Sequence, residues 1–354
     1  MLAAPGAAGP QRMTRKGLAA FAIILFALPL LGGDYYINLG SQILIAAVFA
    51  LSLNLLVGYG GLTSLGHAAY MGVSAYVSGW LFLKFGMGHL ASATLALLFT
   101  TAMAALFGLI ALRASGIGFL MITLALGQVL WGLAFRWVTV TNGDNGLSGL
   151  TRPAPFGINL DGAGAFYWFT LIIFAVSFAC IIAFANSAFG AVLRGTRDQP
   201  RRMLALGHNV WLVRYATFIA AGFWAAVSGL LYVYYHKFIH PQALGLTNSA
   251  ETLLMVIAGG SGTLAGPIVG AAIVVLLKNY VSAFVDRWVM LLGFVFLIIV
   301  LFMPDGLVPG VQRLWERFFG RPAGAGAARV GASSAGTTSA GTTSDGAEAK
   351  EKGG

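Results

Sequence analysis

The sequence predicts an all-α, polytopic membrane protein with about ten transmembrane helices (eight or nine are the alternative counts) and cytoplasmic N- and C-termini. Apolar residues make up 58% of the 354 residues, charged residues make up 9%, and the mean hydropathy is +0.83. A soluble domain carries about a quarter charged residues to cover its water-facing surface. Most of this surface must therefore face lipid, where a spanning chain is helical because every backbone polar group needs an internal partner.

Apolar stretches of bilayer length, about 20 residues, recur along the chain. The first stretch follows Arg12, Arg15 and Lys16 and also resembles a signal peptide. We interpret it as a retained helix, because Tyr35 and Tyr36 after it resemble interfacial anchors. We expect spans near residues 18–36, 37–57, 67–83, 91–112, 117–138, 165–186, 212–235, 250–260, 266–280 and 284–303.

Positive charge orients these spans. The longest hydrophilic interior loop, residues 187–211, is rich in arginine and is therefore placed in the cytoplasm. The basic stretch after the last span belongs on the same side only if residues 250–280 cross twice, with a break at 259–263. That arrangement places 15 of the 21 Lys and Arg residues inside. The expected organisation is a disordered segment at 1–17, a transmembrane domain at 18–308 that includes the cytoplasmic loop 187–211, and a basic cytoplasmic end with a disordered tail at 309–354.

Several chemistries are not signalled by the sequence. The single cysteine, Cys180, excludes an intrachain disulfide, and no His/Cys cluster has metal-ligand spacing. The phosphate-binding loop G-x-x-x-x-G-K-[ST] is missing as well, so any ATP used by this protein is bound by another chain. We expect no catalytic residue, no metal, no cofactor and no nucleic-acid partner.

A first glycine-rich segment, residues 58–80, is a candidate lining of a membrane pathway. Gly60 and Gly61 interrupt a helix, Gly66 starts a small-residue face, and Ser64 and His67 supply polar groups. Irregular backbone at membrane depth is tolerated where protein or a watery cavity satisfies it. The alternative is a cytoplasmic turn in which His67 caps the next helix.

A second glycine-rich segment, residues 258–275, predicts the helix break and close helix packing. Gly259 and Gly260 belong to the break, and Pro267 suits the first turn of a new helix. Gly262, Gly266 and Gly270 are spaced as a doubled G-x-x-x-G stripe on one helix face.

The cytoplasmic loop is predicted to contain one short helix. Asp198 can cap it, Pro200 suits its first turn and Gly207 ends it. Two interpretations stay open: an amphipathic segment that rests on membrane lipid, or a protrusion that docks into a partner's groove. The basic residues of the loop are Arg194, Arg197, Arg201 and Arg202.

Two further polar residues lie in or near spans. Glu251 follows Ser249 closely, so it either caps a helix N-terminus or makes a polar contact in an external vestibule. Asn54 lies within the second span, where it either faces the pathway or bridges helices.

Taken together, these segments resemble the LivM-type permease subunit of ABC importers for branched-chain and related hydrophobic amino acids. The resemblance covers roughly residues 37–308. It is carried by five stretches in family order: ALSLNLLVGYGGLTSLGHAAYMGVSAY (50–76), LRASGIGFLMITLALGQVLWGL (112–133), TNGDNGLSGL (141–150), the loop 190–210, and SAETLLMVIAGGSGTLAGPIVGA (249–271).

The resemblance implies a non-enzymatic, multi-pass subunit of a bacterial inner membrane. It implies four kinds of partner: a second LivH-like permease, two cytoplasmic ATPases, an extracytoplasmic substrate-binding protein, and membrane lipid. It also implies that residues 194–207 are the segment that contacts an ATPase, although Pro200, Arg202 and Met203 stand where the family usually has an acid followed by small residues. Related permeases carry urea or short amides, and a self-contained secondary transporter or channel is the alternative from another class.

Overall fold

The computed structural model describes residues 33–154 and 160–281 and a few isolated positions outside those ranges. The span predicted at 284–303, most of that predicted at 18–36, and the predicted terminal segments 1–17 and 309–354 lie outside the described residues. The predicted count of ten spans and the sides of the termini therefore stay predictions.

Within the described ranges the chain is mostly helical, and helices cover the spans predicted at 37–57, 91–112, 117–138, 165–186 and 212–235. The stretches 67–83, 250–260 and 266–280 are helical too, but that they cross the membrane stays a prediction. Five helices are long and apolar enough to cross a membrane: α2 continued by η1, α4, α5, α7 and α10, whose bounds are given next. The elements are α2 (Asp34–Asn54), the π-helical turn η1 (Leu55–Tyr59), α3 (His67–Phe85), α4 (His89–Ala111), α5 (Ile117–Arg136), α6 (Val138–Thr141), η2 (Gly143–Asn145), β1 (Leu147–Ser148), α7 (Ala163–Asn186), α8 (Ala188–Asp198), α9 (Pro200–Ala205), α10 (Val210–His236), β2 (Phe238–Ile239), η4 (Pro241–Leu244), α11 (Leu246–Gly259) and α12 (Gly266–Val281).

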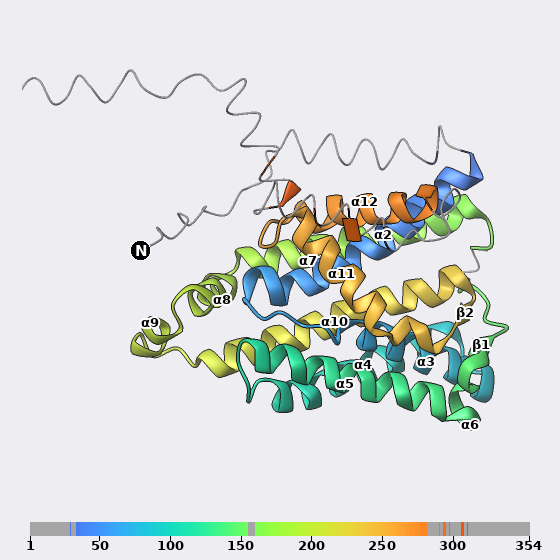
Figure 1. Cartoon of the computed structure of the whole chain (residues 1–354). Helices are drawn as coiled ribbons and strands as arrows, with labels where there is room; N and C mark the ends of the chain where they lie inside the picture. The colour runs from blue at the N-terminus through green and yellow to red at the C-terminus, as the bar shows by residue number, and fades with distance from the viewer. Residues whose placement is uncertain are drawn as a thin grey trace, which may run out of the picture. The chain divides into compact units, whose positions relative to one another are not determined.

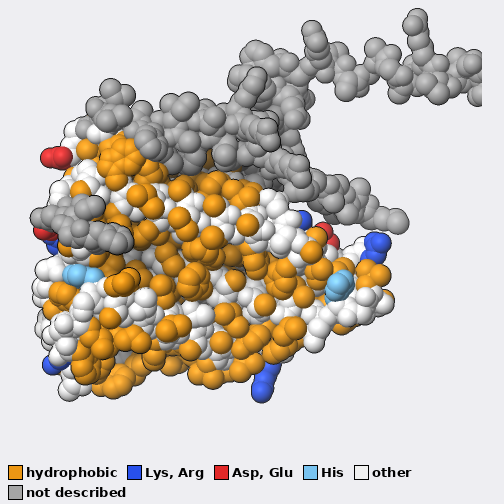
Figure 2. Space-filling model, turned by 180° about the vertical axis from the view of Figure 1, so that it is seen from behind, with side chains coloured by type: hydrophobic (Ala, Val, Ile, Leu, Met, Phe, Trp, Pro, Cys, Tyr) orange, Lys and Arg blue, Asp and Glu red, His pale blue; other side chains and the backbone are white. Residues whose placement is uncertain are grey.

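Helix α2 is the centre of the bundle. It packs against α7, α10, α11 and α12, and its side chains are buried along most of its length. Helices α3, α4 and α10 pack on one another beside it. The outward sides of α4 and α5 carry exposed apolar residues, such as Leu98 and Met121. Figure 2 shows hydrophobic side chains covering one face of the bundle, with the few charged side chains at its margins. Such a surface is suited to lipid rather than water.

The two ends of the bundle differ. Helices α8 and α9 lie at one end, and α6, β1 and β2 lie at the opposite end (Figure 1). The two short strands pair antiparallel, with Leu147 opposite Ile239 and Ser148 opposite Phe238. This small ladder is a departure from the all-α expectation, and it ties the loop before α7 to the chain that follows α10.

Helix α3 begins inside the bundle, and α11 enters it within its first turn, after the exposed residues Leu246 and Thr247. Non-helical residues precede α3, and the 3-10 turn η4 precedes α11. His67, Ala68 and Ser249, at the starts of these helices, are buried. The Ala68 N–H donates to Ser249 Oγ at 3.1 Å, which satisfies one of the backbone donors that a helix start leaves unpaired. Two interrupted segments therefore meet in the protein interior, where backbone outside regular helices can be satisfied.

Candidate functional site

The four arginines of the predicted cytoplasmic loop divide into two pairs. Arg194 Nη1 donates to the carbonyl of Ala185 at 2.7 Å, which fastens α8 to the end of α7. Arg197 Nη1 donates to the carbonyl of Gly58 in η1, the turn that continues α2. Arg201 and Arg202 are exposed on α9. One pair anchors this segment and the other pair is presented outward.

The loop contains two helices, α8 and α9, where the sequence predicts one short helix. Pro200 begins α9, as predicted. The prediction that Asp198 caps it is wrong: Asp198 is the last residue of α8, and its carboxylate accepts from Arg197 Nε at 2.9 Å. Gly207 follows the end of α9 with φ +82°, and the N–H of His208 bonds the Met203 carbonyl at 3.0 Å. This is a Schellman motif, so the predicted role of Gly207 is confirmed.

A second cluster joins the end of α2 to the break between α11 and α12. We call it the glycine junction; it consists of Asn54, Gly58, Arg197, Gly262 and Thr263. The Asn54 side chain donates to the Thr263 carbonyl at 2.9 Å and accepts from the Gly262 N–H at 3.0 Å. Of the two interpretations of Asn54, these contacts fit helix bridging. A role in a pathway stays a prediction.

The predicted break lies at residues 260–265, between α11 and α12. Gly260 and Gly262 have φ of +113° and +81°, which side chains other than glycine rarely adopt. The predicted stripe is therefore wrong for Gly262, which lies in the turn rather than on the helix. Close packing itself is confirmed, because a Cβ on Gly270 would overlap the Met255 carbonyl and one on Gly259 would overlap the backbone of Gly266.

The first glycine segment also brings backbones together. Gly60 ends η1, and Gly61, with φ +66°, lies against the Arg197 side chain. Gly66 is the N-cap of α3, and a Cβ there would overlap the Thr123 carbonyl of α5. The interruption after α2 is therefore held between α8 and α5.

The two polar residues of that segment are fully buried. His67 Nε2 lies 2.8 Å from Ser52 Oγ, and its ring stacks on Phe49 with centroids 5.5 Å apart. The alternative that His67 caps α3 is wrong, because the N-cap is Gly66 and no side-chain cap bond is made there. Within the described part of the chain, Ser64 Oγ and His67 Nδ1 have no hydrogen-bond partner.

Glu251 faces a cavity of about 210 Å³. The capping interpretation of Glu251 is wrong, since α11 begins at Leu246 and places it in the second turn. Its carboxylate lies 3.3 Å from Lys278 Nζ. We call this space the Glu251 cavity; its lining comes from α2 (Gln42, Ile45, Ala46, Phe49), α3 (Met71), α10 (Ser228, Tyr232, Tyr235, His236), α11 (Asn248, Glu251, Thr252, Met255) and α12 (Val274, Val275, Lys278).

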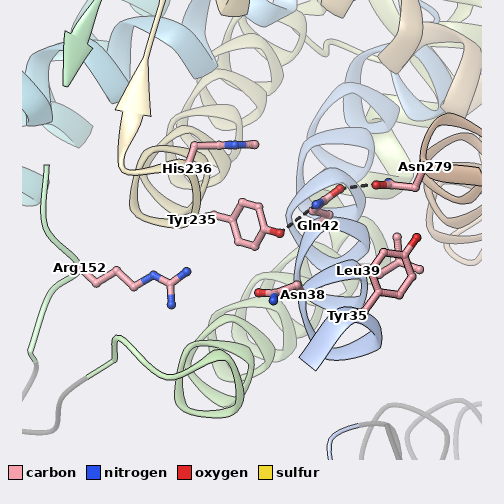
Figure 3. Close-up of a pocket in the computed structure, with 8 residues that line it drawn as sticks. All are labelled: Tyr35, Asn38, Leu39, Gln42, Arg152, Tyr235, His236 and Asn279. Carbon is pink, nitrogen blue, oxygen red and sulfur yellow. Dashed lines mark hydrogen bonds between the residues drawn. The ribbon is translucent and has the colours of Figure 1, made fainter. Parts of the chain in front are cut away.

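A second pocket, of about 400 Å³, shares Gln42, Tyr235 and His236 with the Glu251 cavity. In Figure 3 the Gln42 amide lies between Tyr235 and Asn279 and bonds both, at 2.9 and 3.1 Å. These bonds join α2, α10 and α12 in a polar row. We call this space the Arg152 pocket; its lining is Tyr35, Asn38, Leu39, Gln42, Arg152, Tyr235, His236 and Asn279.

Arg152 fixes the loop that borders this pocket. Its guanidinium donates to the carbonyls of Tyr234 at 3.3 Å, Leu160 at 3.1 Å and Asp161 at 3.0 Å. It also lies over the Phe166 ring, 4.4 Å from the centroid. Burial lowers the pKa of Arg152, and the nearby Asp161 carboxylate opposes that shift.

Sequence reasoning missed most of the cavity lining. Gln42, Asn248, Thr252 and Lys278 come from three helices and carry no local motif. Lys278 did carry a signal, because it is a charge at the end of the apolar run GAAIVVLL. Considering it together with Glu251 would have indicated the ion pair.

Comparison with known proteins gives the relatives of the chain. It is 23% identical to the high-affinity branched-chain amino acid transport system permease protein LivM of Salmonella typhimurium, over 82% of this chain and 74% of that protein. LivM of Escherichia coli is 22% identical over the same shares. A shorter match, 33% identical over 36% of this chain and 35% of the relative, is to the autoinducer 2 import system permease protein LsrC of Salmonella typhi. No solved structure matches.

The chain also matches a family of transport proteins over most of its length. The family described as "Branched-chain amino acid transport system / permease component" matches residues 35–301, which include the bundle, α8, α9, the glycine junction and both cavities. The chain therefore belongs to the family of membrane permease components of branched-chain amino acid transport systems.

Proposed function

We propose that this chain is the translocating subunit of an ATP-driven importer for branched-chain or related amino acids in a bacterial inner membrane. It would act with a second, LivH-like permease, two cytoplasmic ATPases and an extracytoplasmic binding protein. Family membership supports a permease subunit. The partners and the substrate follow from the resemblance to LivM-type importers and are part of the proposal.

The observation that carries the proposal is the way α8 and α9 join the bundle. The segment ends in an outward-facing surface that carries Arg201 and Arg202, and Leu204 and Leu206 beside them are 58% and 64% exposed. Arg197 in the same segment bonds the end of α2. A partner that binds the exposed surface of α9 can therefore displace the backbone at the end of α2 through Arg197.

The glycine junction supplies the next step of the mechanism. Motion of α8 is passed by Arg197 to Gly58, and Asn54 on the same helix holds the turn between α11 and α12. Helix α11 carries Glu251 and α12 carries Lys278. Closure of two ATPases would in this way change the shape of the Glu251 cavity, and no proton relay is needed.

The test is uptake in vesicles that contain both permeases and both ATPases. We expect accumulation of a branched-chain amino acid that requires ATP and the binding protein. Arg201→Glu with Arg202→Glu should reduce ATPase association and uptake together, because these residues belong to the proposed docking surface. Unchanged association and unchanged uptake would mean that α9 only rests on lipid.

The buried Glu251 carboxylate on an interrupted segment favours one rival, a self-contained secondary transporter, since such proteins place ion-coupling carboxylates there. The same vesicles separate the two functions. Uptake that follows an ion gradient and ignores ATP would support the rival. Labelling of cysteines placed at Arg197 and Arg202 in intact cells tests the sidedness, because access from outside would contradict the proposed docking.

A further inference from the structure

The lining of the Glu251 cavity is charged on one side and apolar one helical turn away, because Glu251 and Met255 on α11, like Lys278 and Val274 on α12, are four residues apart. Glu251 and Lys278 form the charged side, with Nζ and Oε2 3.3 Å apart. Phe49, Met71 and Met255 contribute to the apolar side, together with the valines of α12. A solute that fills this cavity must therefore combine charged or polar groups at one end with an apolar body.

The charges of the two ionic residues balance. The Glu251 side chain is 11% exposed and that of Lys278 is 44% exposed, so the carboxylate is the more buried of the two. A solute with a net charge would leave one unmatched charge beside the buried Glu251 carboxylate, which is costly. A zwitterion brings an ammonium group for the carboxylate and a carboxylate for the ammonium, and charge-assisted hydrogen bonds of this kind are strong.

The helix geometry favours one orientation of such a solute. Asn248 in the first turn of α11 lines the cavity, and the positive end of a helix dipole favours a negative group there. Lys278 gives the same preference from α12. The carboxylate of the solute is then directed to Lys278 and the start of α11, while its ammonium group pairs with Glu251.

The size of the cavity also limits the solute. A volume of about 210 Å³ is below the ~300–1,000 Å³ of pockets that hold drug-sized ligands. Ala46 on α2 and Ser228 on α10 are the small residues that leave this space. It suits a small amino acid rather than a peptide.

We propose that the Glu251 cavity is a binding site for a zwitterionic α-amino acid with an apolar side chain, in which Glu251 binds the ammonium group, Lys278 binds the carboxylate, and Phe49, Met71 and Met255 contact the side chain. The proposal rests on the proposed transport function and adds a selectivity filter within the permease itself. The Arg152 pocket, which shares Gln42 with this cavity, is the route by which the solute arrives.

The first test measures binding without transport. The assembled permease–ATPase complex is placed in lipid nanodiscs without the binding protein, and radiolabelled L-leucine is titrated. We expect competition by unlabelled L-leucine, and at least about tenfold weaker competition by leucinamide and by isocaproate, which each lack one charged group. Equal competition by all three, or an absence of saturable binding, would overturn the proposal.

The second test uses variants that change one feature of the cavity each. Glu251→Gln and Lys278→Met should each weaken L-leucine binding about tenfold or more, and the exchange Glu251→Lys with Lys278→Glu should recover part of it. Ala46→Leu should fill the space and abolish binding. Matched controls are Asp161→Asn and Lys237→Met, which break an exposed pair 2.8 Å long, and Ala102→Leu on an exposed face of α4. The controls should bind as the unchanged protein does.

Co-purification of the ATPases with each variant shows that the complex is folded and assembled. Variants of Glu251 and Lys278 that assemble and support uptake at the unchanged rate would overturn the binding site while leaving the proposed function intact. Failure of the unchanged complex to transport any amino acid with ATP would instead overturn the proposed function, whatever the binding assay shows.

Discussion

The glycine junction and the Glu251 cavity both involve α2, yet they are built from different kinds of contact. The junction bonds reach backbone groups: the peptide N–H of Gly262 and the carbonyls of Gly58 and Thr263. The cavity adds contacts that join two side chains, Glu251–Lys278 and Gln42–Tyr235, to the bonds that its other polar residues make with backbone carbonyls. Contacts to the backbone hold two segments at a fixed separation, whereas side chains that face a cavity can bind a solute through their charges and polar groups. The junction therefore suits the proposed transmission of motion, and the cavity suits the proposed recognition of the solute.

The largest effect is expected from Asn54→Asp in the junction. Aspartate can still accept from the Gly262 N–H, but its carboxylate would face the Thr263 carbonyl, to which Asn54 donates. The lost bond and the buried charge should lower the free energy of unfolding by about 3 kcal/mol or more. Thermal melting of the purified complex measures this. The matched control is Asn38→Asp, the same change on the same helix at the Arg152 pocket, and an equal loss there would contradict the special role of the junction.

Gly58→Ala should be the next most damaging change. An added Cβ would overlap the Gly262 backbone and the Asn54 side chain, so these groups would have to separate. Overpacking of this kind costs about 1–3 kcal/mol. Gly132→Ala is the control, because nothing lies within 4 Å of a Cβ built there. That control should be neutral or gain about 0.5–1 kcal/mol from the higher helix propensity of alanine. Equal melting temperatures for the two variants would refute close packing at Gly58.

Arg197→Ala should affect coupling more than stability. The Gly58 carbonyl loses a charged donor, and because the Arg197 side chain is 38% exposed, water replaces part of the bond. We expect a loss of about 1–2 kcal/mol in unfolding free energy and a fall in amino acid imported per ATP hydrolysed. L-leucine binding in the cavity should be unchanged. A fall in binding with unchanged coupling would reverse the roles assigned to the two regions.

The helix breaks at the junction were predictable from the sequence, whereas the contacts across the junction and the lining of the cavity were not. Glycine runs indicate helix breaks by a local rule, so the sequence predicts interruptions at 58–61 and 259–263, which overlap the non-helical residues 60–66 and 260–265. Local signals also predicted the start of α9 at Pro200 and its end at Gly207. The cavity depends on which helix faces bring Gln42, Glu251 and Lys278 together, and a single sequence does not determine helix packing. Glu251 was singled out, but its capping interpretation failed because α11 begins a turn earlier than Ser249 suggests.

Gln42→Leu tests the role of the polar row at the two pockets. Leucine keeps roughly the volume but removes the bonds to Tyr235 and Asn279 made by a residue that lines both pockets. The net loss in unfolding free energy should be about 1 kcal/mol, because each such bond contributes little against water. We expect faster association and dissociation of L-leucine with little change in the dissociation constant. Unchanged rates would show that the polar row does not control access to the Glu251 cavity.

The smallest effect is expected from Asp161→Asn near the Arg152 pocket. The carboxylate pairs with Lys237 at 2.8 Å, but the two side chains are 60% and 44% exposed. An exposed ion pair contributes about 0–1 kcal/mol, since water screens the attraction and both side chains lose freedom. Arg152 bonds the Asp161 carbonyl rather than its carboxylate, so the loop that borders the pocket should stay in place. Melting temperature and uptake should both be nearly unchanged. A large loss of uptake would mean that the Asp161 charge near the Arg152 pocket takes part in recognition. The solute would then be selected before it reaches Glu251.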